Sequence, residues 1–359
     1  MRRGASLPHI SGVGMPNRKL SLCLIGFGNV GRAFTELLLR EHDRLQAETG
    51  LDLVVTGICT ARFGSIASPL GVDLLGALER SNAGSPHGPF EESTAFAATC
   101  HADIVVETTP LEPFTGAVGI AIIRAALAAR RSVASANKGP VAHDLRALKD
   151  LARRHGVQYR YESAVADGMP VFSLIERTLP CANVTAVTGL LNSTSGIVLE
   201  ALSDGRSFSQ GIEIAKALGI VEDDAQFDLD GWDAAVKLCA LSAALWDKPI
   251  HVEDVNRAPM SDALATTAID ARARGNRLVS MATLQSSPSD EAVHARVEIT
   301  EIGPESVFFA LTGTSLGLRF ETSLLQPLTI SCSDPRLADT AYGLLADVLH
   351  IGQDDSSRT

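Results

Sequence analysis

Apolar and polar positions follow one pattern in the first half of the chain. Short apolar runs predict strands at 20–26, 51–59, 102–110, 131–140 and 157–164. Longer amphipathic segments between them predict helices, which run from about residue 30 to Leu45, through 120–129 and through 145–154. Strands that alternate with helices in this way form a parallel sheet covered on both faces. We therefore expect a Rossmann-type doubly wound α/β domain at 19–161, after a disordered leader at 1–18.

The pattern changes after Gly168. An extended run at 183–192 precedes segments that predict helices, which lie at 196–203, 207–218 and 231–247. Strand-like stretches follow at 292–302, 306–312, 317–323 and 327–332. This mixture predicts a second α+β domain at 162–333, the place of a substrate domain. A last helix at 334–351 begins near Pro335, and we expect it to pack back and complete the first domain.

Composition limits the classes of protein to consider. The 359 residues suffice for two domains with separate cores. No segment approaches the ~20 continuous apolar residues that span a bilayer, so we expect no membrane partner and a cytoplasmic protein. A net charge of −11 would repel nucleic acid. The six cysteines are scattered without a CxxC pair, and we interpret them as small hydrophobes in a reducing compartment.

A glycine-rich loop follows the first predicted strand. The sequence GFGNVG places Gly26, Gly28 and Gly31 where a dinucleotide-binding turn needs them, around Asn29 and Val30. The first glycine permits the tight turn, the second lets the backbone approach a pyrophosphate, and the third allows close packing of helix on strand. A turn without a ligand is the alternative, but the strand before and the helix after favour a dinucleotide site.

The end of the second predicted strand indicates which dinucleotide binds. A carboxylate there would bond the ribose 2′-hydroxyl of NAD, but this strand ends in Thr60-Ala61-Arg62. Arg62 can pair with a 2′-phosphate, so we favour NADP and keep NAD as the alternative. If Arg62 is simply a solvated loop residue, it does not indicate which of the two binds. Two more loops at strand ends carry Thr108, Thr109 and Lys138, where ligands of such sheets bind, although Lys138 could equally be a surface lysine.

A solitary lysine stands out in the second half. Lys237 is the only charge between Ala234 and Trp246, in a helix that is apolar nearly all round. A buried ammonium needs a partner, and Asp233 lies one helical turn before it, with Asp228 and Glu222 upstream. We expect burial beside Lys138 to lower the pKa of Lys237, so that it can give a proton to an alkoxide formed from an aldehyde. The alternative is a structural Asp–Lys pair.

These residues together resemble the homoserine dehydrogenases. The resemblance extends over nearly the whole chain and rests on GFGNVG, ANKGP, YESAVADGMP, LLNSTSGIVLEAL and EDDAQFDLDGWDAAVKL. It implies interconversion of L-aspartate 4-semialdehyde and L-homoserine with NAD(P), in the biosynthesis of threonine, methionine and isoleucine. It also implies a homodimer.

The resemblance implies roles for particular residues. Lys237 matches the proton donor, Lys138 lies beside cofactor and substrate, and Asp233 orients the lysine. Residues matched to substrate binding are Glu222, Asp228 and Asn192. A loop that holds a monovalent cation such as Na⁺, chiefly through backbone carbonyls, is matched by Glu162, Val165 and Asp167.

Two segments depart from the family pattern. The chain has NSTSGIVL where members often read NGTTNYIL, and SCSDPRLAD where many carry a glycine-rich loop near the cofactor. These changes keep two alternatives open: a dehydrogenase of another amino-acid-derived aldehyde or keto acid, and a non-catalytic NADP-binding protein. The chain ends where longer relatives add a regulatory domain, so we expect a short form without threonine feedback by that route.

Overall fold

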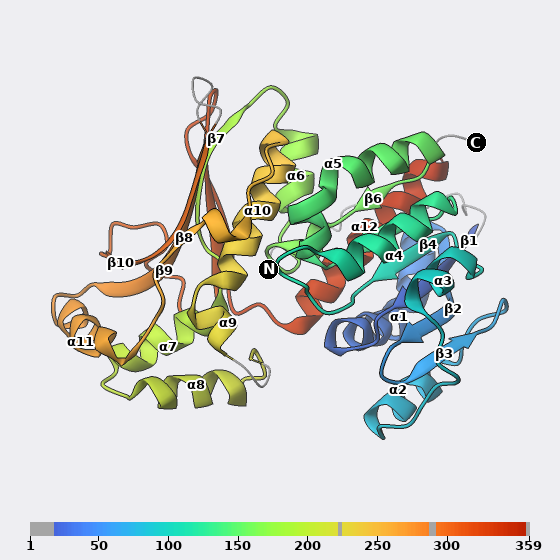
Figure 1. Cartoon of the computed structure of the whole chain (residues 1–359), viewed down its shortest axis with the longest axis horizontal. Coiled ribbons are helices and arrows are strands. Elements are labelled where there is room, and N and C mark those ends of the chain that lie inside the picture. The colour runs from blue at the N-terminus through green and yellow to red at the C-terminus, as the bar shows by residue number, and fades with distance from the viewer. Residues whose placement is uncertain (1–17, 222–224, 287–291, 357–359) are drawn as a thin grey trace, which may run out of the picture.

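The structure, a computed structural model, describes residues 18–221, 225–286 and 292–356. It has two halves, each built on its own sheet (Figure 1). The elements of the first half are β1 (Arg18–Ile25), α1 (Asn29–Thr49), β2 (Leu51–Thr60), β3 (Gly64–Ala67), α2 (Leu74–Asn82), α3 (Ser93–Thr99), β4 (Ile104–Glu107), α4 (Ala117–Ala128), β5 (Ser132–Ser135), α5 (Lys138–His155), β6 (Tyr159–Arg160) and the 3-10 turn η1 (Glu162–Ala164).

The first sheet has the strand order β3-β2-β1-β4-β5-β6. β1 pairs in parallel with both β2 and β4, and β5 pairs in parallel with β4 and β6, whereas β3 is antiparallel to β2. The chain therefore reverses its direction of travel across the sheet between β1 and β4, which is where ligands of such sheets bind. The Rossmann-type fold predicted from the sequence is confirmed.

Helix α1 shows how the sequence sets the first half. It begins after Gly28, ends at Gly50 in the left-handed conformation, and buries Phe34, Leu37 and Leu38. These apolar side chains recur at helical spacing and join the core formed by β1, β2 and β4. The helix is thereby fixed with its N-terminus at the carboxyl end of β1.

The second half is a mixed sheet with helices packed against it. Its elements are α6 (Val171–Thr178), β7 (Val184–Leu190), α7 (Ser193–Ser203), α8 (Phe208–Ala217), α9 (Gln226–Leu229), α10 (Trp232–Trp246), η2 (Val252–Asp254), β8 (Asn256–Arg257), η3 (Asp262–Leu264), α11 (Ala265–Ala273), β9 (Arg277–Ser286), β10 (Val293–Ile302), β11 (Leu316–Thr322) and β12 (Leu328–Cys332). The strand order is β12-β11-β7-β9-β10-β8, and the pairs are antiparallel except β8 with β10. This agrees with the α+β half expected from the sequence.

One predicted strand in this half is wrong. Residues 306–312 form turns, in which the amides of Phe309 and Leu311 donate to the carbonyls three residues earlier. Phe308 and Leu311 are buried against Leu190 and Ile302. The apolar run therefore reflects burial of a turn rather than an extended chain.

The chain returns to the first half with α12 (Leu337–Ser356), which lies beside α1 (Figure 1). Ala341, Leu344 and Val348 of α12 belong to the same core as β1 and α1.

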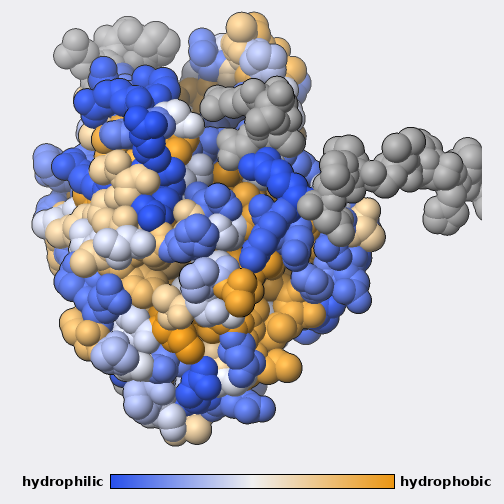
Figure 2. Space-filling model, turned by 90° about the vertical axis from the view of Figure 1, so that its right-hand side faces the viewer, coloured by the Kyte–Doolittle hydropathy of each residue, from blue (hydrophilic) through white to orange (hydrophobic). Residues whose placement is uncertain are grey.

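Seen from the side of the first half, hydrophilic and apolar patches are interspersed over the surface (Figure 2). Among the described residues, no helix is both long enough and apolar enough to cross a membrane.

Candidate active site

A cleft of about 1070 Å³ opens at the carboxyl ends of the strands of the first sheet. It is lined by the β1–α1 turn, the end of β2 and the loops after β4 and β5. The residues predicted for cofactor binding that line it are Gly26, Gly28, Asn29, Val30, Arg62, Thr108, Thr109 and Lys138. Gly31 does not line the cleft; a Cβ there would lie 2.6 Å from the Gly26 carbonyl oxygen, so it serves close packing.

The β1–α1 turn fits a pyrophosphate. Gly26 has φ +98°, and a Cβ on it would lie 2.6 Å from the backbone of Thr108, so only glycine fits there. A Cβ on Gly28 would have no atom within 4 Å, which leaves the approach to the backbone open. Among the described residues, no side chain caps the N-terminus of α1, so its first amides can bind an anion, and the dipole of this 21-residue helix favours negative charge there.

The charges along the cleft are all positive. Its cations are Arg32, Arg62 and Lys138, and none of the lining residues in the described part of the chain carries a carboxylate. The Arg62 guanidinium lies 5.2 Å from the Phe63 ring centre, and Arg32 donates to the Asn29 side-chain oxygen at 2.8 Å. Arg32 was not predicted from the sequence, because a polar residue on an amphipathic helix is usually solvated; its place in the first turn after the glycines was the available signal.

Lys138 and Lys237 share one carboxylate. Lys138 Nζ lies 2.8 Å from Asp233 Oδ1, and Lys237 Nζ lies 2.9 Å from Asp233 Oδ2. The side chains are 20%, 14% and 11% exposed for Lys138, Lys237 and Asp233 respectively. Lys138 begins α5 and Lys237 lies on α10, and these helices pack against one another where the two halves meet (Figure 1). The structure thus brings the predicted pair of lysines to one point between the halves.

Asn192 connects this carboxylate to a second one. Its Nδ2 donates to Asp228 Oδ1 and to Asp233 Oδ2, both at 3.0 Å, while its Oδ1 accepts from the Ser195 amide and caps α7. Asp228 Oδ2 also accepts from the Thr194 hydroxyl at 2.7 Å. The predicted residues Asn192 and Asp228 therefore belong to the same network, and Thr194 is a further member that was not predicted from the sequence.

Burial and neighbouring charges shift the pKa values within this network. Burial raises the pKa of Asp233, but the charges of Lys138 and Lys237 outweigh it and hold that pKa well below its usual range. Burial and the charge of Asp233 raise the pKa of Asp228. For Lys237, burial lowers the pKa, but Asp233, Asp167 and Asp228 outweigh it, so the pKa is raised. The lowered pKa expected from the sequence is therefore wrong, because the carboxylates around this lysine outnumber its neighbouring cation.

Two of the three hydrogens of the Lys237 ammonium are used by acceptors in the described part of the chain. One N–H donates to the Leu191 carbonyl oxygen at 2.6 Å and a second to Asp233. An ammonium carries three donors, so the third can reach an oxygen placed between α10 and the cleft. The role of Leu191 was not visible from sequence, because a backbone carbonyl carries no residue signature.

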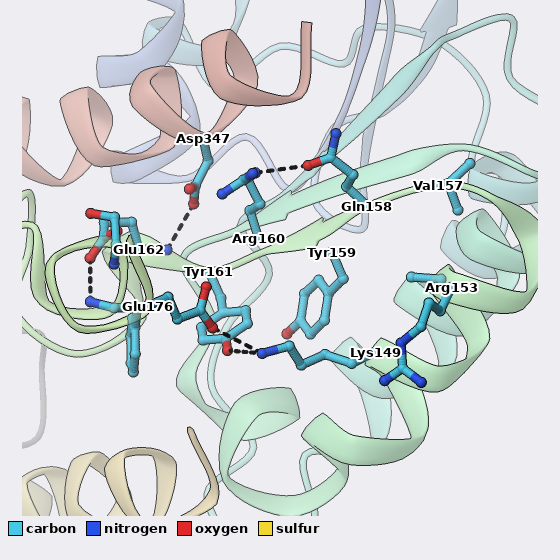
Figure 3. A pocket seen from close by; sticks show the side chains of 13 residues that line it. Lys149, Arg153, Val157, Gln158, Tyr159, Arg160, Tyr161, Glu162, Glu176 and Asp347 are labelled. Carbon is cyan, nitrogen blue, oxygen red and sulfur yellow. Dashed lines mark hydrogen bonds and ion pairs between the residues drawn. The ribbon is translucent and has the colours of Figure 1, made fainter. Parts of the chain in front are cut away.

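Three other predicted residues lie in the segment that follows β6, and one of them, Glu162, lines a smaller cavity. The Glu162 carboxylate accepts from the amides of Phe172 and Ser173 at 2.7 and 2.9 Å, so it caps α6 beside a cavity of about 210 Å³ (Figure 3). Val165 is buried, and Asp167 Oδ1 accepts from the Thr340 hydroxyl. The described residues contain no group of three His, Cys, Asp or Glu placed to hold a metal ion. Glu222 lies outside the described residues.

Comparisons with known proteins agree with this geometry. The family model of homoserine dehydrogenase matches residues 170–349, and that of the homoserine dehydrogenase NAD-binding domain matches residues 26–162. The NAD(+)-dependent homoserine dehydrogenase of Pseudomonas canavaninivorans is 31% identical over 338 residues, which cover 92% of this chain and 96% of that protein.

Solved structures show the same fold. Homoserine dehydrogenase from Thermoplasma acidophilum aligns with a TM-score of 0.79 at 22% identity, over 94% of this chain and 100% of that one. A hyperthermophilic archaeal homoserine dehydrogenase in complex with NADPH aligns with a TM-score of 0.78 at 23% identity, over 94% and 98%. The Rossmann-type sheet, its glycine-lined cleft and the matching NAD-binding model define an NAD(P)-dependent oxidoreductase acting on a CH–OH group. The chain belongs to the homoserine dehydrogenase family, as the sequence motifs predicted.

Proposed function

We propose that the chain interconverts L-homoserine and L-aspartate 4-semialdehyde, with Lys237 giving the proton when the aldehyde is reduced. The observation that carries the proposal is the pairing of Lys237 and Lys138 on the two oxygens of Asp233. Lys138 lines the cofactor cleft, so this pairing puts the Lys237 ammonium next to the place where a nicotinamide and a substrate would meet. A structural Asp–Lys pair would not need a second lysine from the other half.

The chemistry requires one hydride and one proton. When bound in the cleft, NAD(P)H would supply the hydride. The carbonyl oxygen then gains negative charge, which the Lys237 ammonium stabilises and neutralises by giving up its third hydrogen. Asp233 and the Leu191 carbonyl hold the amine in place before and after this transfer. In the reverse direction, the neutral amine takes the proton from the homoserine hydroxyl.

The substrate's ammonium group needs an anion, and the second half supplies it. Asp228 and Asp233 both accept a hydrogen bond from Asn192, and Glu222 precedes Asp228 in the sequence. We assign the substrate α-ammonium to Asp228 and Glu222, with Asn192 positioning both Asp228 and Asp233. We also propose that residues 19–161 with the helix at 334–351 bind the cofactor, and that residues 162–333 bind the substrate and join the subunits.

We further propose that NADP is preferred over NAD. The support is the lining of the cleft, where Arg62 follows the end of β2, Arg32 lies in the first turn of α1, and no described lining residue is acidic. A 2′-phosphate would meet two guanidinium groups and no repelling carboxylate. The relative from Pseudomonas canavaninivorans is named as NAD(+)-dependent, which makes NAD the competing outcome.

Three further assignments rest on family membership and on the composition of the chain. We propose a monovalent cation such as Na⁺ held by backbone carbonyls of Glu162, Val165 and Asp167, since the Glu162 carboxylate is occupied as a helix cap. We also propose a homodimer. A cytoplasmic location is supported by the six cysteines, all of which are free thiols.

The test is an oxidation assay on the purified chain. Homoserine should be oxidised with a higher kcat/KM than other amino alcohols of similar size, and faster with NADP⁺ than with NAD⁺. A higher rate on another amino alcohol would replace the substrate assignment. Binding of NADPH without oxidation of any amino alcohol would point instead to a non-catalytic NADP-binding protein.

A further inference from the structure

Glu107 is a buried acid for which the reaction described above has no use. It ends β4 and is 0% exposed, and no cation pairs with it in the part of the chain that the structure describes. Burying a carboxylate without a counter-charge is costly, so it is retained only where hydrogen bonds satisfy it. Here the donors are the Thr109 amide at 2.9 Å, the Thr109 hydroxyl, the Ser135 hydroxyl at 2.6 Å and Asn137 Nδ2 at 3.3 Å.

The directions of these hydrogen bonds are fixed by the partners of each donor. Asn137 Oδ1 accepts from the Gly139 amide, so the Asn137 NH₂ group must face Glu107. The Ser135 oxygen accepts from the Asn137 amide, which leaves its own hydrogen to donate to Glu107. Because Glu107 only accepts, the arrangement suits the ionised carboxylate. Burial nevertheless raises the pKa of Glu107, in spite of these hydrogen bonds.

The network joins the two loops nearest the proposed reaction centre. Thr109 belongs to the loop after β4, and Asn137 caps α5 immediately before Lys138. Thr109, Asn137 and Lys138 all line the cleft, whereas Glu107 itself lies behind them in the core. Its carboxylate therefore lies behind the two loops that line the cleft beside Lys138.

We propose that Glu107 is a positioning residue that holds the β4 and β5 loops together and, through its buried negative charge, favours the oxidised nicotinamide. The oxidised ring is a cation and the reduced ring is neutral, so a nearby anion stabilises only the former. Lys138 and Lys237 bring two positive charges to this region, and Asp233 and Asp228 bring negative charges from the second half. Glu107 adds a negative charge from the first half, behind the loops that line the cleft, and this charge attracts an oxidised ring but not a reduced one.

The test variant is Glu107→Gln, which removes the charge and keeps the shape. A glutamine can place its oxygen toward Thr109 and Asn137 and its NH₂ toward Ser135, whose hydroxyl can accept. Dissociation constants are measured for NADP⁺, NADPH and 2′-phospho-ADP-ribose, which lacks the nicotinamide. We expect the affinity for NADP⁺ to fall roughly 5- to 50-fold relative to that for NADPH, as loss of one charge pair at short range in a protein implies. The affinity for 2′-phospho-ADP-ribose should not change.

Ser135→Ala is the matched control, because it removes one hydrogen bond from the network and leaves the charge. Its ratio of the two dissociation constants should equal that of the wild type. A Glu107→Gln variant that loses affinity for both cofactor forms equally, or for neither, overturns the proposal. These binding measurements need no substrate. They are therefore independent of the homoserine oxidation assay, whose failure with the wild-type chain would contradict the proposed function instead.

If the Glu107→Gln variant does not fold, the Glu107→Asp variant is measured in its place. It keeps the charge but withdraws the carboxylate from Thr109 and Asn137, so kcat for homoserine should fall while the ratio of NADP⁺ to NADPH affinity stays near that of the wild type. An unchanged kcat, or a ratio that changes as in the loss of charge, contradicts the proposal.

Discussion

Asp233 does two tasks with one carboxylate, since each oxygen binds a lysine from a different half of the molecule. Buried ions are costly to desolvate, and such groups persist only with close partners and complete hydrogen bonding. Asn192 supplies the remaining donor to Asp233 Oδ2. The consequence is a Lys237 that is charged at neutral pH, which suits proton donation in aldehyde reduction and opposes proton removal in homoserine oxidation.

This difference predicts that the rates of oxidation and reduction depend differently on pH. The pKa of Lys237 lies above its ordinary value of 10.5, so the neutral amine needed for oxidation accumulates only in strongly alkaline solution. The kcat for homoserine oxidation should therefore rise with pH through pH 10, while that for aldehyde reduction stays flat near neutrality. In Asp233→Asn the pKa of Lys237 should drop, which shifts the oxidation profile to lower pH by about 1 unit or more. Identical profiles in the wild type and the variant would contradict this role of Asp233.

Arg62 gives a second prediction at the scale of single residues. Arg62→Ala should weaken NADP⁺ binding roughly 10- to 100-fold, because a charge-assisted pair with the 2′-phosphate is lost, and should leave NAD⁺ binding nearly unchanged. Titration calorimetry with both dinucleotides measures the effect. Arg44→Ala is the control, since Arg44 lies on the same half with its side chain 69% exposed and does not line the cleft. Equal losses for both dinucleotides would refute the proposed preference.

The sequence predicted which side chains meet but not all of their chemistry. Lys237 and Asp233 were visible because one charge pair in an apolar helix is unusual, and Lys138 because it follows a strand end. The direction of the Lys237 pKa shift was mispredicted, since it depends on how many carboxylates fold around the amine. Leu191 and Thr194 left no signal: one acts through its backbone, and the other is an ordinary residue in the first turn of a helix.

At the scale of elements, α12 closes the first half with a buried acid. Asp347 is 3% exposed and accepts from the Glu162 amide at 2.7 Å (Figure 3). Burial raises its pKa from an ordinary value of 3.8 to about 8. A carboxyl whose pKa is higher in the folded than in the unfolded state binds its proton more tightly when folded. Stability should then fall as the pH rises from about 4 to 8.

Asp347→Asn should remove this pH dependence. Asparagine keeps the acceptor for the Glu162 amide and carries no proton to lose, so the variant should gain roughly 1–3 kcal/mol in free energy of unfolding at pH 8 and almost nothing at pH 4. Urea unfolding at the two pH values measures the difference. Asp270→Asn on α11, an exposed position, is the control and should change neither value. A gain of equal size at both pH values would disprove the buried proton.

The elements most readily predicted were those with clear periodicity. The parallel strands β1, β2, β4, β5 and β6 and the helices α1, α4 and α5 were predicted, because a parallel sheet buries continuous apolar runs between amphipathic helices. The antiparallel strand β3 and the short helices α2 and α3 were not predicted. β9 was missed and residues 306–312 were mispredicted, although both are rich in apolar residues. The difference lies in tertiary contacts: β9 pairs with β7 and β10, whereas Phe308 and Leu311 fill a small core from within turns.

At the scale of the whole molecule, neither half holds a complete site. The first half forms the cofactor cleft and contributes Lys138, while the second contributes Lys237, Asp228 and Asn192. The docking of α5 on α10 brings the two groups together. Cofactor binding and proton transfer should therefore be separable by substitution, because they depend on different halves.

The most direct measurement is the reaction of Lys237→Met with homoserine, made alongside NADPH binding by the same variant. Methionine fits the apolar surroundings of α10, and Lys216→Met on α8 is the control for a change of lysine elsewhere in the same half. We predict a fall in kcat of roughly 10²- to 10⁴-fold with unchanged NADPH affinity, as expected for loss of a general acid–base group. Turnover close to that of the wild type would contradict the assignment of Lys237, and with it the account of how the two halves form one site.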